Sequence, residues 1–267
     1  NRCRRQRQMC IRDRDNMPIS WFGFEYETKS ELEKISASNK EIVLLTQTFA
    51  SPSTKSLIEE FRSNYKNVKH ITYDSFSESS ALNAYESRYG VRGLSNYDFS
   101  KSKVIVSIGA DFLGDWQGGG FDCSYAKGRI PDKGTMSRHI QFESNMTLSG
   151  ANADVRVPLK LNEQKLVLIE IYKSIVGNKI QLKSDISLNE KTKKIVDALI
   201  REIKSAADGS VIISGIKDED YQSLVLEINE KLNSYSFKPS NTILTRSSDA
   251  VSYTHLTLPT TPVVWGA

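Results

Sequence analysis

The clearest hydrophobic pattern in the chain is a short run of mostly β-branched residues that ends at a glycine. Val104 to Ile108 are apolar apart from Ser107, and Gly109 follows them. A continuous apolar run of this length is typical of a central strand in a parallel sheet, which is buried on both faces. Because ligands of open α/β sheets bind at the carboxyl ends of strands, the segment from Gly109 to Gly120 is the first place to look for function.

Similar short apolar runs alternate along the chain with segments in which apolar residues recur at helical spacing. The short runs predict strands at 41–46, 68–73, 104–108, 138–142, 154–159, 211–213 and 242–244. The helical spacing predicts helices from about residue 30, after residues 51–53, and at 77–89, 122–129, 166–176, 191–207 and 218–232. Strands that alternate with helices predict an α/β fold with a doubly wound, mainly parallel sheet. Pro158 places the strand at 154–159 on the edge of that sheet.

The pattern divides the chain into two blocks between two unusual ends. We expect an α/β domain over residues 17–183 and a second, incomplete α/β unit over residues 184–249. Residues 1–16 and 250–267 differ in composition from the rest and resemble translated sequencing-adapter sequence. We therefore treat both ends as foreign or disordered tails and the body as a fragment of a longer protein.

Composition excludes several classes of protein. With 39% hydrophobic residues among 267, the chain can bury a substantial core. The net charge of +4 owes most to six arginines within the first fourteen residues, so the body is near neutral and nucleic acid is not an expected partner. No run is long enough for a direct membrane span. The three cysteines form no Cys-x-x-Cys pair, which argues against a cysteine-ligated metal site within this segment.

Four segments, in this order along the chain, resemble the molybdopterin oxidoreductase superfamily. They are Ile19-Ser20-Trp21, the strand and loop from Val104 to Trp116, the stretch from Ser144 to Leu159, and Ser210 to Gly215 followed by Ile228-Asn229-Glu230-Lys231-Leu232-Asn233. Within the superfamily the chain most closely resembles the iron–sulfur subunit of bacterial alternative complex III, a quinol-oxidising respiratory assembly. The resemblance spans residues 17–249.

The resemblance implies a region that faces a pterin guanine dinucleotide in cofactor-binding members. The matching residues here are Gly109, Asp111, Glu143, Ser144, Asn145 and Asp154. The departures from the family pattern affect the mechanism. Residues 73–77 offer no cysteine to molybdenum, the Asp-Pro-Arg loop reads Glu143-Ser144-Asn145, and the Pro-Gly-Thr-Asp loop reads Lys160-Leu161-Asn162-Glu163. The lost arginine removes a bidentate phosphate partner.

These losses favour a retained fold that has no molybdenum cofactor and serves as a scaffold for other subunits of a membrane respiratory complex. We expect this fragment alone to be inactive, with iron–sulfur clusters in a C-terminal region outside it. The resemblance also implies a location on the periplasmic side of the inner membrane, peripheral through partner subunits. Two alternatives stay open. One is an active oxidoreductase dependent on molybdopterin guanine dinucleotide, with Asp74 or Ser75 as metal ligand; the other is a generic nucleotide-binding α/β module.

Other candidate groups favour structural roles. Gly118-Gly119-Gly120 lacks the lysine and serine or threonine of a phosphate-binding P-loop. His70 and His139 each stand in or beside a predicted strand without a carboxylate or cysteine at ligand spacing. We expect Asp111 and Asp115 to cap backbone amides rather than to act as an acid–base pair. Cys123 is expected to be a small packing residue.

Overall fold

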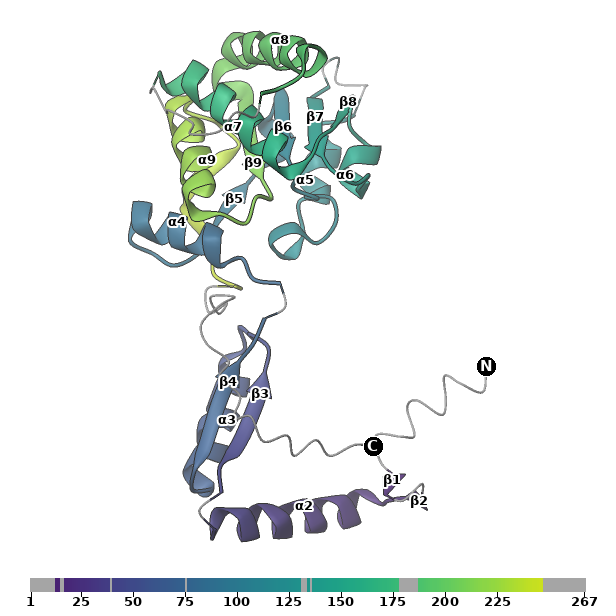
Figure 1. Cartoon of the computed structure of the whole chain (residues 1–267), viewed down its shortest axis with the longest axis vertical. Helices are drawn as coiled ribbons and strands as arrows, with labels where there is room; N and C mark the ends of the chain where they lie inside the picture. Colours follow the sequence, from purple (N-terminus) through teal and green to yellow (C-terminus); the bar gives the residue numbers. More distant parts are fainter. Residues whose placement is uncertain are drawn as a thin grey trace. The chain divides into compact units, whose positions relative to one another are not determined.

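The computed structural model describes residues 13–14, 17–38, 40–74, 76–130, 134, 136–177 and 187–246. The chain forms two compact units, Asn1–Tyr73 and Asp74–Ala267 (Figure 1). The adapter-like tails lie outside the described residues, except that β1 (Asp13–Arg14) pairs with β2 (Met17–Pro18).

The first unit contains one parallel pair of strands and two helices. Besides β1 and β2, its elements in the described residues are α2 (Trp21–Ser36), β3 (Ile42–Thr46), α3 (Pro52–Asn64) and β4 (Val68–Thr72), with β3 parallel to β4. Helix α2 begins earlier than the expected start near residue 30, because the side chain of Ser20 accepts a hydrogen bond from Gly23 N and caps the helix there. Among the described residues of this unit, only Ile58 is buried.

The second unit alternates strands and helices from Asp74 onward. Its elements are α4 (Ser79–Tyr89), β5 (Leu94–Tyr97), η2 (Phe99–Lys101), β6 (Val104–Ile108), η3 (Trp116–Gly118), α5 (Asp122–Lys127), β7 (Arg138–Glu143), α6 (Leu148–Ala151), β8 (Val155–Pro158), α7 (Leu161–Val176), α8 (Glu190–Ala206), η5 (Ala207–Gly209), β9 (Ser210–Ser214), α9 (Glu219–Lys231) and β10 (Phe237–Ile243).

A four-stranded parallel sheet in the order β8-β7-β6-β9 organises this unit and confirms the predicted α/β class with a parallel, doubly wound sheet. Strand β6 is central, and β8 lies at the edge as Pro158 predicted. The expected boundary near residue 183 does not separate two sheets, because β9 pairs directly with β6. The division between the two units falls instead at Tyr73 and Asp74. Strand β5, which no pattern predicted, forms a separate antiparallel pair with β10.

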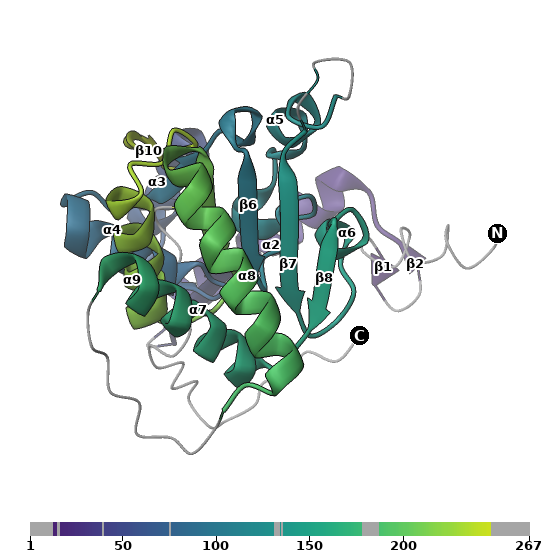
Figure 2. The same cartoon turned by 90° about the horizontal axis from the view of Figure 1, so that it is seen from above.

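Two apolar layers cover the sheet. On one face, alternate residues of β6 such as Val106 and Ile108 pack with α7, α8 and α9, and Figure 2 shows α7 and α8 on the near side of β6 and β7. On the other face, Ile105 packs in an aromatic cluster that includes Phe99, Phe112 and Tyr125. The sheet is therefore buried on both sides, as a parallel sheet requires. Cys123, in contrast to its expected packing role, is exposed.

Helix α9 closes the outer edge of β9 with two amide side chains. Asn229 accepts a hydrogen bond from Ile212 N at 2.9 Å and donates one to Ile212 O at 2.7 Å. Gln222 donates to the carbonyl oxygens of Ser214 and Ile216 at 3.1 and 2.7 Å. An open strand edge is a template for further pairing, so these contacts end the sheet at β9. They give the Ile228-Asn229 motif a structural explanation.

Candidate functional site

The carboxyl end of the parallel sheet gathers five of the six residues that the family resemblance assigned to a cofactor. Gly109 follows β6, Asp111 lies two residues further on, and Glu143 is the last residue of β7, with Ser144 and Asn145 directly after it. The sixth residue, Asp154, precedes β8 and lies at the amino end of that strand. The structure therefore does not bring Asp154 together with the other five.

Asp111 fixes the loop after β6 to the start of α6. Its Oδ1 accepts hydrogen bonds from Ser149 N at 2.9 Å and Ser149 Oγ at 2.8 Å. The same serine hydroxyl accepts a hydrogen bond from Leu113 N at 2.9 Å. Gly114 lies against the other carboxylate oxygen, where a Cβ atom would overlap it. The expected capping role of Asp111 is confirmed, and its carboxylate holds two loops together.

Glu143 is 2% exposed, and both of its carboxylate oxygens have partners within the protein. Oε1 pairs with Arg156 Nε at 2.5 Å and accepts a hydrogen bond from Thr147 N at 3.3 Å. Oε2 accepts hydrogen bonds from Thr147 Oγ1 at 2.6 Å and Gln141 Nε2 at 3.3 Å. Gly150 packs directly on this carboxylate and leaves no room for a Cβ atom. A buried carboxylate needs such partners to remain charged.

Glu143 ends a row of buried polar side chains along β7. His139, Gln141 and Glu143 alternate with the apolar Ile140 and Phe142. Gln141 Nε2 donates to Ala110 O at 3.1 Å, and its Oε1 lies 3.1 Å from His139 Nε2. Burial lowers the pKa of His139 to about 4, so the ring is neutral at pH 7. In the neutral ring, Nε2 then carries the hydrogen that Gln141 Oε1 accepts.

This buried polar row could not be predicted from the sequence for a physical reason. Alternation of polar and apolar residues is typical of a strand with one face in water. Here the polar face is covered as well, because Phe112 and Tyr125 pack against His139. Thr147, Gly150 and Arg156 complete the surroundings of Glu143, yet their spacing in the sequence carries no sign of that contact.

Asp154 holds the amino end of β8 rather than a ligand region at the carboxyl end. Arg129 donates to both of its carboxylate oxygens, at 2.6 and 3.0 Å. Oδ2 also accepts a hydrogen bond from His139 N at 2.7 Å. The hydrogen bonds from Arg129 lower the pKa of Asp154 and outweigh the effect of its partial burial. The contact between β7 and β8 thus depends on a charged pair at their amino ends.

Protein atoms occupy the point where the strand order reverses, between β6 and β9. Gly215 lies against the backbone of Gly109 so closely that a Cβ atom on Gly215 would overlap the Gly109 carbonyl oxygen. On its other side, Gly109 would place a Cβ atom 2.7 Å from Gln164 Oε1. Gln164 in turn donates to Ser144 Oγ at 2.9 Å and Leu159 O at 3.0 Å. This crevice is the usual ligand position in open α/β sheets.

One pocket of about 530 Å³ does lie at this end of the sheet. It is lined by Ser144, by Pro158 to Leu161 and by Glu163, and so adjoins two of the loops in which the sequence departs from the pattern that it resembles. Asn145, next to Ser144, is exposed and has no hydrogen-bond partner in the described part of the chain. These groups offer hydroxyl, amide and ammonium contacts to a polar ligand.

Metal ligands do not gather in the described residues, which hold no group of three histidine, cysteine or carboxylate side chains suited to a metal ion. Of the two alternative molybdenum ligands, Asp74 interacts with other protein groups, whereas Ser75 lies outside the described residues. None of the helices in the described ranges is long and apolar enough to cross a bilayer.

Comparison with known proteins identifies the fold but no family. No protein-family model and no curated protein matches the sequence. Acetylene hydratase from Pelobacter acetylenicus is similar in structure, with a TM-score of 0.50 and 15% sequence identity over 82% of this chain and 33% of the hydratase chain. The formyltransferase/hydrolase complex from Methylorubrum extorquens, solved with methylofuran, gives a TM-score of 0.48 and 13% identity over 78% and 54% of the two chains. The second score is too low to support an argument.

The likeness to acetylene hydratase agrees with the predicted α/β fold class. The chain spans only 33% of the length of that enzyme. We conclude that the chain has an α/β fold similar to that of part of acetylene hydratase.

Proposed function

We propose that this chain is part of a molybdopterin-oxidoreductase-like subunit of a quinol-oxidising respiratory complex, in which the domain is a scaffold without a molybdenum cofactor. Electron transfer would run through iron–sulfur clusters in another part of the subunit. The complex would lie on the periplasmic side of the inner membrane and be held there by partner subunits. The alternative complex III resemblance of residues 17–249 and the fold likeness support this proposal.

The main support for the scaffold role is that both carboxylate oxygens of Glu143 already have hydrogen-bond partners within the protein. In cofactor-binding members the matching carboxylate accepts hydrogen bonds from the guanine edge. Here Arg156, Thr147 and Gln141 already occupy both oxygens. A guanine would have to displace these partners and leave buried polar groups unpaired, which costs about 1–3 kcal/mol for each group. The residues present therefore fit a pterin dinucleotide poorly.

The contact between Gly109 and Gly215 supports the same conclusion independently. A dinucleotide that enters the crevice between β6 and β9 needs space between the two loops that follow these strands. Backbone atoms of Gly109 and Gly215 meet there, and Gln164 covers Gly109. Binding would require both loops to separate.

A second candidate function is an active oxidoreductase dependent on molybdopterin guanine dinucleotide. The pocket beside Ser144 favours it, because about 530 Å³ is open at the carboxyl ends of β7 and β8. Lys160 in its wall would supply a positive charge for a phosphate. This candidate requires Glu143 to exchange its internal partners for the guanine.

Purification of the complete gene product from its native membranes tests the respiratory role. We expect an affinity-tagged subunit to co-purify with iron–sulfur and haem subunits and with quinol-oxidising activity. Recovery of the tagged protein alone, with no other subunit and no quinol oxidation, would contradict the proposal.

A further inference from the structure

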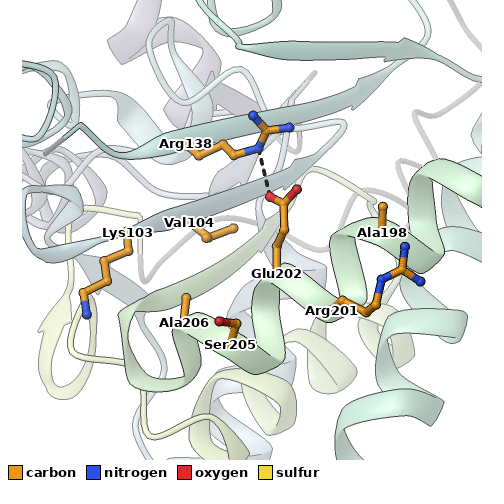
Figure 3. Close-up of a pocket in the computed structure, with 8 residues that line it drawn as sticks. All are labelled: Lys103, Val104, Arg138, Ala198, Arg201, Glu202, Ser205 and Ala206. Atoms are coloured by element: carbon orange, nitrogen blue, oxygen red, sulfur yellow. Dashed lines mark ion pairs between the residues drawn. The ribbon is translucent and has the colours of Figure 1, made fainter.

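A second pocket lies at the amino ends of the strands, away from the loops already described. It has a volume of about 810 Å³ and lies between the starts of β6 and β7 and the C-terminal half of α8. Figure 3 shows the side chains that line it. Neither the resemblance nor the proposed scaffold role assigns a function to this surface.

Three basic side chains and one carboxylate line this pocket, so it carries net positive charge. Lys103 precedes β6, Arg138 begins β7, and Arg201 and Glu202 lie on α8. Arg138 Nε pairs with Glu202 Oε2 at 2.8 Å. That pair positions the guanidinium, whose two terminal nitrogens have no partner in the described part of the chain.

Two of the three cations are not used by the fold. Lys103 and Arg201 are exposed, and neither side chain has a hydrogen bond or ion pair among the described residues. In Figure 3 they lie on opposite sides of Glu202, while Arg138 and Glu202 point toward each other. Ser205, between Lys103 and Arg201 in this view, adds a hydroxyl donor.

We infer that this pocket is a docking site for an extended acidic segment of a partner subunit. Lys103 and Arg201 lie on opposite sides of Glu202 with Arg138 beside it, so the positive charge is spread along the pocket in a way that suits successive carboxylates of an extended chain. Guanidinium groups bind carboxylates bidentately, and complementary charge raises both the association rate and the specificity. The inference rests on the proposed scaffold role only in taking the partner to be another subunit.

Fluorescence anisotropy with the full chain and a fluorescein-labelled poly-glutamate peptide tests the inference. We expect binding at low salt that weakens as salt is added. Combined Lys103→Glu and Arg201→Glu substitutions are expected to raise Kd by about tenfold or more, since rim charges are reversed. Lys193→Glu is the matched control, because Lys193 is exposed in the first turn of α8 and does not line the pocket. It should change Kd less than about twofold.

Three outcomes would overturn the inference. The first is that the peptide does not bind the wild-type chain, and the second is that the doubly substituted chain binds it equally well. The third is that inorganic pyrophosphate displaces the peptide when the two are present at equal concentrations of negative charge, which would indicate a site for small anions. Far-UV circular dichroism checks folding, and single Arg201→Gln provides a milder variant with the same expected direction. Molybdenum content is measured separately, so failure of the docking inference and failure of the scaffold role are distinguishable.

Discussion

Glu143 shows how one residue decides between a ligand site and a structural site. The family resemblance implies a ligand-facing role for this carboxylate, and the structure gives both of its oxygens internal partners. The position at the end of β7 was predictable from the strand pattern. The contacts with Thr147 and Arg156 were not, because they depend on how the loop after β7 folds back.

Replacement of Glu143 by glutamine tests this structural role. Glu143→Gln leaves Arg156 without its counter-ion and weakens the hydrogen bonds from Thr147. Because Arg156 is partly exposed, we expect a loss of about 2 kcal/mol in the free energy of unfolding. Urea denaturation measures it, with Glu170→Gln, an exposed carboxylate on α7, as the control. Unchanged stability in Glu143→Gln would show that the internal contacts contribute little.

His139 gives the domain a pH dependence whose direction follows from its pKa. Burial lowers the pKa from 6.5 to about 4, so the unfolded chain binds a proton more readily between these values. Stability is therefore full above pH 6.5 and falls as the pH drops toward 4, by up to about 3 kcal/mol from this residue. Tyr125 contacts the ring, and among the nearby charges Asp154 and Glu143 raise the pKa of His139 whereas Arg129 lowers it, all to a smaller extent than burial does.

Comparison of wild type with His139→Gln isolates this contribution. The variant should lose the fall in unfolding free energy that His139 causes between pH 6.5 and 4. His70→Gln, in the first unit, serves as the control and should keep it. Parallel pH profiles for wild type and His139→Gln would contradict the assignment.

At the scale of elements, the positions of most strands in the sheet could be predicted from apolar runs. The exact ends of the helices and the pairing of the strands could not, because they depend on individual side chains and on contacts between segments far apart in the sequence. The pattern predicted β6 through β9 and a helix at 77–89, and α4 ends at Gly90 in the left-handed conformation. The early start of α2 and the pairing of β5 with β10 were not predicted, because a single capping serine and an edge contact leave little periodic signal.

The two hydrogen bonds from the Asn229 side chain on α9 to the Ile212 backbone on β9 are expected to stabilise the edge of the sheet strongly. Asn229→Ala leaves the N–H and carbonyl groups of Ile212 unpaired at a buried edge, which should cost about 2–3 kcal/mol. Asn162→Ala, at an exposed position of α7, should be nearly neutral. Thermal unfolding of both variants measures the difference. An equally small effect of the two substitutions would argue against edge closure by Asn229.

At the scale of the whole molecule, the two units differ sharply in how much they bury. The second unit has apolar clusters on both faces of its sheet, whereas only Ile58 is buried in the described part of the first unit. Composition predicted a substantial core for the chain but not its concentration after Asp74. The parallel pairing of β3 and β4 in a sheet of their own also lay beyond the pattern, because strand order is not encoded in periodicity.

Separate expression of the two units tests this asymmetry. Residues 74–246 should unfold cooperatively on heating, because they retain both apolar clusters. Residues 17–73 should show a broad, weakly cooperative transition, since a two-stranded sheet with so small a core is marginal. Circular dichroism distinguishes the two outcomes, and a sharp transition in residues 17–73 would contradict the expectation.

The scaffold role is tested most directly by molybdenum and pterin analysis of the intact complex purified from native membranes. Metal content is measured by inductively coupled plasma mass spectrometry, and pterin is measured by its fluorescence after denaturation. The internal contacts of Glu143 and the contact between Gly109 and Gly215 predict no stoichiometric molybdenum or pterin, and the proposed iron–sulfur clusters predict iron. Stoichiometric molybdenum together with pterin in the same subunit would contradict the account.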